Sequence, residues 1–213
     1  MSLFVTFEGP DGSGKTTQAH LLADVLRQQG YAVVSTREPG GSPIGDQIRA
    51  VLHDCANTDM TPRAEFLLYS ASRAQLVDQV IRPALAEGKV VLCDRFYDSS
   101  LAYQGYGRQL DLPALREITR FATGGLVPDL TLYLDLPPDQ GLERRLLGSG
   151  EWNRLDQEAL AFHQRVRAGY LALSEMEPTR WCIIDGNRAV ETVQAEVQAV
   201  VLAHLGACPP TCG

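Results

Sequence analysis

Long apolar runs, a basic charge balance and a targeting segment are all missing from this chain of 213 residues. No apolar stretch approaches the length that a membrane span requires, and the N-terminus leads directly into a strand-like segment. These absences predict a cytoplasmic protein without a membrane partner. The formal net charge of −7 argues against nucleic acid as a partner, because binding the phosphate backbone requires a basic surface.

Cysteines are few, odd in number and scattered, with five in the whole chain. Cys93 and Cys182 lie inside apolar, strand-like runs, where a thiol behaves as a small hydrophobic group. Cys208 and Cys212 close the chain with His204 as the one nearby histidine. A metal or redox site there is the weaker alternative to an ordinary frayed tail.

The clearest positive signal is a glycine-rich segment at residues 9–16, which reads Gly-Pro-Asp-Gly-Ser-Gly-Lys-Thr. It matches the phosphate-binding pattern G-x-x-x-x-G-K-[ST] in full, between an apolar run at 3–7 and a helical apolar spacing that ends at Gly30. In that context backbone N–H groups and a helix N-terminus face an anion. We therefore predict that ATP is bound by Gly9, Pro10, Asp11, Gly12, Ser13, Gly14, Lys15, Thr16 and Thr17, with Lys15 on the β- and γ-phosphates and Thr16 on Mg²⁺.

The rest of the chain alternates strand-like and helix-like segments. We predict strands at 31–36, 90–94, 129–136 and 181–184, helices near 44–52, 61–87, 112–121, 156–174 and 189–205, and a helix start at Pro137-Pro138. Short apolar strands separated by helices indicate an α/β fold, here a five-stranded parallel sheet covered on both faces. Ligands bind such sheets at the carboxyl ends of the strands.

Asp94 and Arg95 follow the apolar run at 90–93 and so lie at one of these ends. Phosphate-loop enzymes place a carboxylate there for Mg²⁺ or its waters, so we assign Thr16 and Asp94 to the metal. A GTPase would need an Asn-Lys-x-Asp segment, and neither Lys15 nor Lys89, the only lysines, lies in one. A motor or transport ATPase usually carries partner modules that do not fit in this length. Small kinases remain.

A kinase of this size needs a second pocket for its acceptor. Arg37 follows the second strand, while Phe66 and Arg73 are seven residues apart on one predicted helix and share a face. Ser100, Tyr103 and Gln104 are spaced i, i+3, i+4 and share a face if they are helical. For Phe66, packing in the core is an equal alternative, and for Tyr103 and Gln104 the alternative is a plain helix surface.

Together these motifs resemble thymidylate kinases along essentially the whole chain. The resemblance rests on Glu8-Gly-Pro-Asp-Gly-Ser-Gly-Lys-Thr-Thr17, Arg37-Glu-Pro-Gly-Gly41, Ser72-Arg73, Asp94-Arg-Phe96, Tyr103-Gln104 and Leu132-Tyr-Leu-Asp135. It implies a P-loop kinase fold, transfer of the γ-phosphoryl of ATP to dTMP with Mg²⁺, and a homodimer.

The resemblance also implies roles for single residues. Asp11 contacts the acceptor, Arg37 and Arg95 hold its phosphate, Phe66 stacks on thymine, Arg73 bonds the edge of the base, and Tyr103 crowds the 2′ position. Gly12 stands where one subclass carries a loop arginine, so the chain resembles the subclass whose catalytic arginine lies in a small mobile lid. Here the lid spans about 143–156, with Arg144, Arg145 and Arg154 as candidates.

The domain prediction is a single kinase domain over 1–206, with a tail at 207–213. A deoxynucleoside kinase or a non-catalytic nucleotide-binding module are the alternative functions. A nucleoside kinase has no use for two arginines that face an acceptor phosphate, and a non-catalytic module is expected to have lost Lys15 or Asp94.

Overall fold

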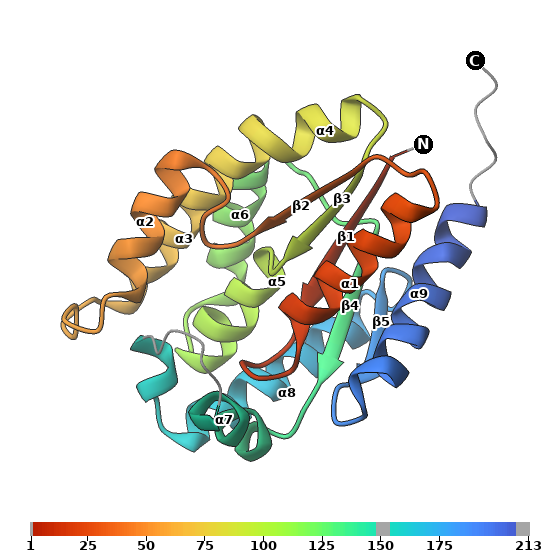
Figure 1. Cartoon of the computed structure of the whole chain (residues 1–213). Helices are drawn as coiled ribbons and strands as arrows, with labels where there is room; N and C mark the ends of the chain where they lie inside the picture. Colours follow the sequence, from red (N-terminus) through yellow and green to blue (C-terminus); the bar gives the residue numbers. More distant parts are fainter. Residues whose placement is uncertain (1, 148–153, 208–213) are drawn as a thin grey trace.

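A computed structural model describes residues 2–147 and 154–207 of the chain. Its centre is a parallel sheet of five strands in the order β2-β3-β1-β4-β5 (Figure 1). The strands are β1 (Leu3–Glu8), β2 (Val33–Arg37), β3 (Val90–Asp94), β4 (Leu130–Asp135) and β5 (Trp181–Asp185). The five predicted strands are confirmed, each to within two residues at either end.

Helices cover both faces of the sheet because its strands are apolar on both sides. Alternate residues of β1 point in opposite directions. Leu3, Val5 and Phe7 pack against α1 (Lys15–Gln28) and α9 (Val190–Ala207), which lie in front of the sheet in Figure 1. Phe4 belongs to a second core on the other face of the sheet. That face is covered by α3 (Pro62–Leu76), α6 (Leu112–Thr123) and α8 (Leu160–Met176). The predicted two-sided α/β sheet is confirmed.

Capping side chains set the starts of three helices. Ser42, Thr61 and Asp111 each accept a hydrogen bond from the backbone N–H three residues ahead, and so cap α2 (Pro43–His53), α3 and α6. The single helix predicted at 61–87 is instead three segments: α3, a π-helical turn at Val77–Ile81, and α4 (Arg82–Ala86). Pro83 explains the break, because proline lacks an N–H and its ring clashes with the preceding turn.

The segment after β3 is helical, as the shared face of residues 100, 103 and 104 requires, but it is not regular. The short α5 (Tyr97–Ser100) runs into a π-helix at Leu101–Gly107, which widens the turn. Such π-turns gather at functional sites. The remaining helical segments are α7 (Pro138–Leu147) and a 3₁₀ turn at Arg154–Gln157. Helix α8 thus starts at residue 160 and not at 156.

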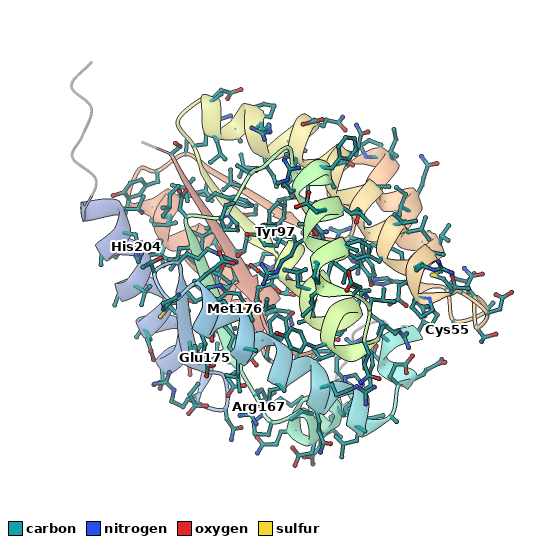
Figure 2. The ribbon with its side chains drawn as sticks, turned by 180° about the vertical axis from the view of Figure 1, so that it is seen from behind. Cys55, Tyr97, Arg167, Glu175, Met176 and His204 are labelled. Carbon is teal, nitrogen blue, oxygen red and sulfur yellow. The ribbon has the colours of Figure 1, made fainter. Side chains whose placement is uncertain are left out.

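Part of the predicted lid, residues 148–153, lies outside the described residues, as does the tail with Cys208 and Cys212. Cys93 is buried in β3 and Cys182 packs beside the core in β5, which confirms their apolar surroundings. Cys55 lies in the loop after α2, on the opposite side of the molecule from His204 (Figure 2). Within residues 2–147 and 154–207, none of the helices combines the length and the apolar character of a membrane span.

Candidate active site

A cavity of about 570 Å³ opens at the carboxyl ends of the strands. The parallel register brings these ends together, since Asp94 at the end of β3 lies beside Phe7 of β1 and Arg37 of β2. Fifteen of the residues predicted from the sequence line it: Asp11, Gly12, Gly14, Lys15, Thr16, Thr17, Arg37, Arg73, Asp94, Arg95, Ser100, Tyr103, Gln104, Arg144 and Arg145. Five do not: Gly9, Pro10, Ser13, Phe66 and Arg154.

The phosphate loop connects β1 to α1, and its last glycine leads into the helix. Gly14 has φ +91°, which suits glycine, and α1 begins directly after it at Lys15. The Lys15 ammonium is buried and donates to the Pro10 carbonyl at 2.7 Å. Burial and the nearby Arg95 lower the pKa of Lys15 to about 8. The helix N-terminus and this cation together form an anion site.

Thr16 and Asp94 come from different elements and contact each other in the wall of the cavity. The Thr16 hydroxyl donates to Oδ2 of Asp94, so the first turn of α1 touches the end of β3. A hydroxyl and a carboxylate side by side are hard oxygen ligands, the type that Mg²⁺ prefers. Within the described ranges, no three His, Cys, Asp or Glu side chains form a metal cluster of their own. This donor set fits a Mg²⁺ ion that takes its other ligands from phosphates and water.

Asp11, Arg95 and Tyr103 form a polar cluster beside the loop. Nη2 of Arg95 lies 2.8 Å from Oδ1 of Asp11, and the Tyr103 hydroxyl donates to Oδ2 of Asp11 at 3.1 Å. Burial alone would raise the pKa of Asp11, but Arg95, Lys15 and Arg145 outweigh it and hold the pKa well below its usual range. Asp11 is therefore an anion, and Arg95 is its direct partner.

Arg73 lines the cavity and is almost wholly buried, with 1% of its surface exposed. Its Nε and Nη2 bind Glu38, with 2.7 Å between Nη2 and Oε2, and Nη2 also donates to Ser100 at 2.8 Å. Nη1 is buried and has no partner within the described residues. A buried donor without an acceptor is costly, so this atom marks a place for a ligand acceptor.

Phe66 does not reach that place. It is 2% exposed and packs in the core between α3 and the sheet, so the core alternative describes its position. Tyr69, one turn further along α3, lines the cavity instead. Both residues share a face with Arg73, but at a rise of about 1.5 Å per residue Tyr69 is only about 6 Å from Arg73 along the helix axis, whereas Phe66 is about 10.5 Å away. Tyr69, and not Phe66, lines the cavity together with Arg73.

Arg154 also lies away from the cavity. It pairs with Glu65, which is fully buried in α3 and is bound as well by Arg108 at 3.2 Å and by Nε2 of Gln104 at 2.7 Å. The three partners together lower the pKa of Glu65, although burial opposes them. Arg154 thus neutralises a buried carboxylate from the far side of residues 148–153.

Arg144 and Arg145, on α7, do line the cavity. Nη1 of Arg144 donates to the Gly186 carbonyl and Nη2 to Asn187, both at 3.0 Å, whereas Arg145 forms an ion pair with Asp156 at 2.6 Å. Gly12 has φ +81°, and a Cβ there would collide with the carbonyl of Gly141 on the same helix. The loop therefore leaves no room for an arginine at position 12.

Arg37 and Asp135, which end strands β2 and β4, have simple surroundings. Arg37 is exposed and lies 3.3 Å from Asp46, so its cation is only loosely held at the rim. Asp135 ends β4 and binds Arg167 through two hydrogen bonds of 2.8 Å. Arg167 extends from α8 at the lower edge of the view in Figure 2. This pair fixes α8 to the sheet, so the role of Asp135 is structural.

Several lining residues were not predicted from the sequence. They are Glu38, Pro39, Arg49, His53, Tyr69, Phe96, Ser99 and Leu155. Arg49 and His53 come from α2, whose approach to the cavity is a matter of tertiary packing. Burial and Arg49 lower the pKa of His53 to about 4, so this imidazole is neutral at pH 7. For Tyr69, the four-residue spacing to Arg73 was a usable signal.

Comparisons with known proteins agree with this geometry. A family model described as thymidylate kinase matches residues 7–197. The chain belongs to the thymidylate kinase family. It is 52% identical to a thymidylate kinase of Roseiflexus castenholzii, over 98% of this chain and 96% of that protein. It is 54% identical to one of Deinococcus radiodurans, over 93% and 96%. A crystal structure of the thymidylate kinase from Ehrlichia chaffeensis superposes with a TM-score of 0.78 at 33% identity, covering 94% of this chain and 98% of that one.

Proposed function

We propose that this chain transfers the γ-phosphoryl group of ATP to dTMP, which yields ADP and dTDP. The observation that carries the proposal is one cavity lined by two different groups of residues. Lys15, Thr16 and Asp94 supply a triphosphate and metal site, and Tyr69 lines the same cavity together with Arg73, whose Nη1 has no partner within the described residues. Membership of the thymidylate kinase family supports the same reading.

The reaction needs positioning and charge, and little proton chemistry. The bond between the γ-phosphorus and its bridging oxygen breaks, and an oxygen of the dTMP phosphate bonds to that phosphorus. The acceptor oxygen is already anionic at pH 7, so no general base is required. Negative charge spreads over the transferred group, and preorganised cations are what lowers its energy. Lys15 holds the β- and γ-phosphates. Mg²⁺, held by Thr16 and Asp94 when bound, neutralises charge on the donor phosphates.

The acceptor occupies the side of the cavity formed by β2, α3 and the segment after β3. Arg95, supported by Arg37 at the rim, receives its phosphate, while the ionised Asp11 faces the sugar side. Nη1 of Arg73 donates to the exposed carbonyl of the base, and Ser100 and Gln104 border the same edge. Tyr69 supplies the flat face on which thymine stacks. Tyr103, fixed by its bond to Asp11, fills the space that a 2′-hydroxyl would need.

Arg144 and Arg145 extend the site toward the transferred group. We assign the donor side to Arg144, because it contacts the turn after β5, and the transferred phosphoryl to Arg145, because its charge acts on Asp11. The lid at 143–156 would close over the cavity when both substrates are bound, so that water is excluded during transfer.

We also propose that the protein works as a homodimer. Leu67 on α3, Phe121 on α6, and Ile44 and Val51 on α2 are apolar and between 46% and 88% exposed. Helix α3 packs between α2 and α6, so these side chains lie on neighbouring helices. Burying them against a second copy removes apolar surface from water. Sedimentation of wild-type protein and of Leu67→Glu tests this, and a monomeric wild type contradicts it.

One assay tests the main proposal. Purified protein is given ATP, Mg²⁺ and, in separate reactions, thymidine, deoxycytidine, dTMP, dUMP, UMP and dCMP, and ADP release is followed. We expect turnover with dTMP and none with the nucleosides, because Arg95 and Arg37 then have no phosphate to bind. Preference for a nucleoside indicates the deoxynucleoside kinase alternative, and no turnover with any acceptor indicates a nucleotide-binding module.

A further inference from the structure

Glu8 is a buried carboxylate that touches the active site only through other residues. It ends β1, directly before the first glycine of the loop, is 0% exposed and does not line the cavity. Oε1 accepts the backbone N–H of Phe96 at 2.8 Å. Oε2 accepts the hydroxyls of Ser99 at 2.6 Å and of Tyr170 at 2.9 Å. The carboxylate thus joins β1, the residue after Arg95, α5 and α8.

The same two hydroxyl oxygens hold the guanidinium of Arg95. Nη1 of Arg95 donates to Ser99 at 3.0 Å, to Tyr170 at 3.2 Å and to the Gly9 carbonyl at 3.0 Å. A guanidinium only donates, and each hydroxyl has a single hydrogen. The hydroxyl hydrogens must therefore point away from Arg95. The two hydroxyl oxygens lie 2.9 Å apart and only one of them can donate to the other, so Oε2 of Glu8 accepts at least one of the two hydrogens. This acceptor keeps a lone pair of each hydroxyl oxygen turned toward Arg95.

Two unfavourable features meet at this point. Arg95 has φ +71°, a left-handed conformation that side chains rarely adopt. Burial, and the charge of Asp98 next to it, raise the pKa of Glu8 to about 7, so the buried charge is itself costly. Strained and destabilised groups of this kind persist where the surroundings hold them and function uses them. A purely structural contact would be served as well by uncharged groups.

We propose that Glu8 is a positioning residue for the acceptor phosphate: it fixes the backbone of Arg95 through Phe96, and the guanidinium of Arg95 through Ser99 and Tyr170. The inference rests on the proposed function, in which Arg95 binds the phosphate of dTMP. Glu8 itself touches no substrate. Its effect is to keep Nη2 of Arg95 at a fixed place in the cavity, between Asp11 and the acceptor.

The primary test is Glu8→Gln, which keeps the shape but replaces one acceptor oxygen with a donor. We expect the KM for dTMP to rise about 10- to 100-fold, as for the loss of hydrogen bonds to a charged group, with the KM for ATP within about threefold of wild type. The matched control is Asp98→Asn. Asp98 is equally buried and lies in the same core, but it binds Arg180 and not Arg95. Its dTMP KM should stay within about threefold or fall, because loss of the Asp98 charge favours the ionised form of Glu8, even if stability falls.

A second pair of variants keeps the test valid if Glu8→Gln does not fold. Tyr170→Phe retains the ring stacked on Tyr133, at a centroid distance of 4.9 Å, and removes one acceptor of Arg95; Ser99→Ala removes the other. Each should raise the dTMP KM about 3- to 10-fold without a matching change for ATP. Equal rises for ATP and dTMP, or no rise beyond that of Asp98→Asn, overturn the inference.

Arg95→Ala separates this inference from the proposed function. If Arg95→Ala leaves the dTMP KM unchanged, the acceptor role of Arg95 is wrong, and the proposed function with it. If Arg95→Ala raises the KM and Glu8→Gln does not, only the positioning role fails. In the Arg95→Ala background, adding Glu8→Gln should change the dTMP KM by less than about threefold, because coupled residues do not add.

Discussion

Arg145 binds Asp156 through two nitrogen atoms, with Nε 3.1 Å from Oδ1 and Nη2 2.6 Å from Oδ2. Arg145 belongs to α7 and Asp156 to the 3₁₀ turn, so the pair joins the two sides of residues 148–153. The same guanidinium lines the cavity and acts electrostatically on Asp11. It is thus held in place before any phosphate arrives.

The three candidate lid arginines should therefore differ in effect. Arg145→Ala should lower kcat by roughly 10³-fold with a modest change in the ATP KM, because a positioned arginine stabilises the transferring phosphoryl group. Arg154→Ala should leave kcat within about tenfold and lower the free energy of unfolding by about 1.5–3 kcal/mol, because Glu65 loses a charged partner. Arg144→Ala should act mainly on the ATP KM. Steady-state kinetics with urea unfolding check all three, and wild-type kinetics for each contradict the lid assignment.

Lys15→Ala should leave the fold intact while it removes the main charge on the β- and γ-phosphates. We expect turnover to fall on the order of 10²-fold or more, as for the loss of one preorganised group. The half-buried Lys89, which pairs with Glu87 at 2.5 Å, is the matched control, and Lys89→Ala should keep wild-type turnover. Near-normal activity of Lys15→Ala would show that the loop does not bind the donor.

The acceptor order should be dTMP, then dUMP, then UMP and dCMP. Loss of the thymine methyl removes one small apolar contact, so dUMP should fall by roughly 10- to 200-fold in kcat/KM. UMP should fall further, because its 2′-hydroxyl loses water without gaining a partner. Cytosine presents an amino donor to Arg73, which also donates, so dCMP should be poor. A preference for CMP or UMP over dTMP shows that the pocket is misassigned.

Tyr103 offers a finer test of the sugar discrimination. Tyr103→Phe keeps the ring and should keep the preference for dUMP over UMP, whereas Tyr103→Ala opens the 2′ space and should relax it. The ratio of kcat/KM for the two monophosphates is the measurement. Because the Tyr103 hydroxyl also binds Asp11, Tyr103→Phe should raise the dTMP KM slightly without altering that ratio.

Substitution of Tyr69 should mainly weaken dTMP binding, whereas substitution of Phe66 should mainly lower the stability of the protein. Stacking of a base on an aromatic ring is worth about 1–3 kcal/mol, so Tyr69→Ala should raise the dTMP KM by roughly 5- to 150-fold. Phe66→Ala removes a buried ring and should lower the free energy of unfolding by about 3–5 kcal/mol, with a smaller effect on KM. If Phe66→Ala raises the dTMP KM more than Tyr69→Ala does, Phe66 and not Tyr69 is the residue that stacks on the base.

The free energy of unfolding should depend on pH through the protonation of Glu8. The folded pKa of Glu8 is raised from 4.5 to about 7 by burial and Asp98, with Arg95, Lys15 and Tyr170 also facing it. Between these values the folded chain holds a proton that the unfolded chain has lost. The stabilisation of the folded state by this bound proton is complete below pH 4.5 and is lost as the pH rises through 7. From pH 5 to 8, wild type should lose up to about 3 kcal/mol relative to Glu8→Gln in urea unfolding. A constant difference contradicts the raised pKa.

The sequence contained enough local information for the sheet, the phosphate loop and most of the cavity. Strand runs and capping residues act over a few positions, so β1 to β5 and the starts of α2, α3 and α6 could be read directly. Lys15, Thr16 and Asp94 belong to motifs whose spacing fixes their geometry. The break of the helix at Pro83 and the late start of α8 depend on how turns compete with tertiary packing, and these were mispredicted.

Side-chain partners were the part that the sequence could not supply. Whether Phe66 or Tyr69 faces the cavity depends on the rotation and the axial position of α3 against the sheet, which Glu38 and Ser100 fix through Arg73. Arg154 resembled a lid arginine because its buried partner Glu65 is 89 residues away. Such long-range ion pairs leave no periodic signal in a single chain.

At position 95 the left-handed backbone places the stability of the protein in conflict with its activity. Glycine takes that conformation without cost, whereas an arginine there loses about 1–3 kcal/mol. Exchange for glycine would relieve the backbone and delete the guanidinium in the same step. Selection for heat resistance alone should then drive this position toward glycine and leave a sturdier protein that no longer holds its acceptor.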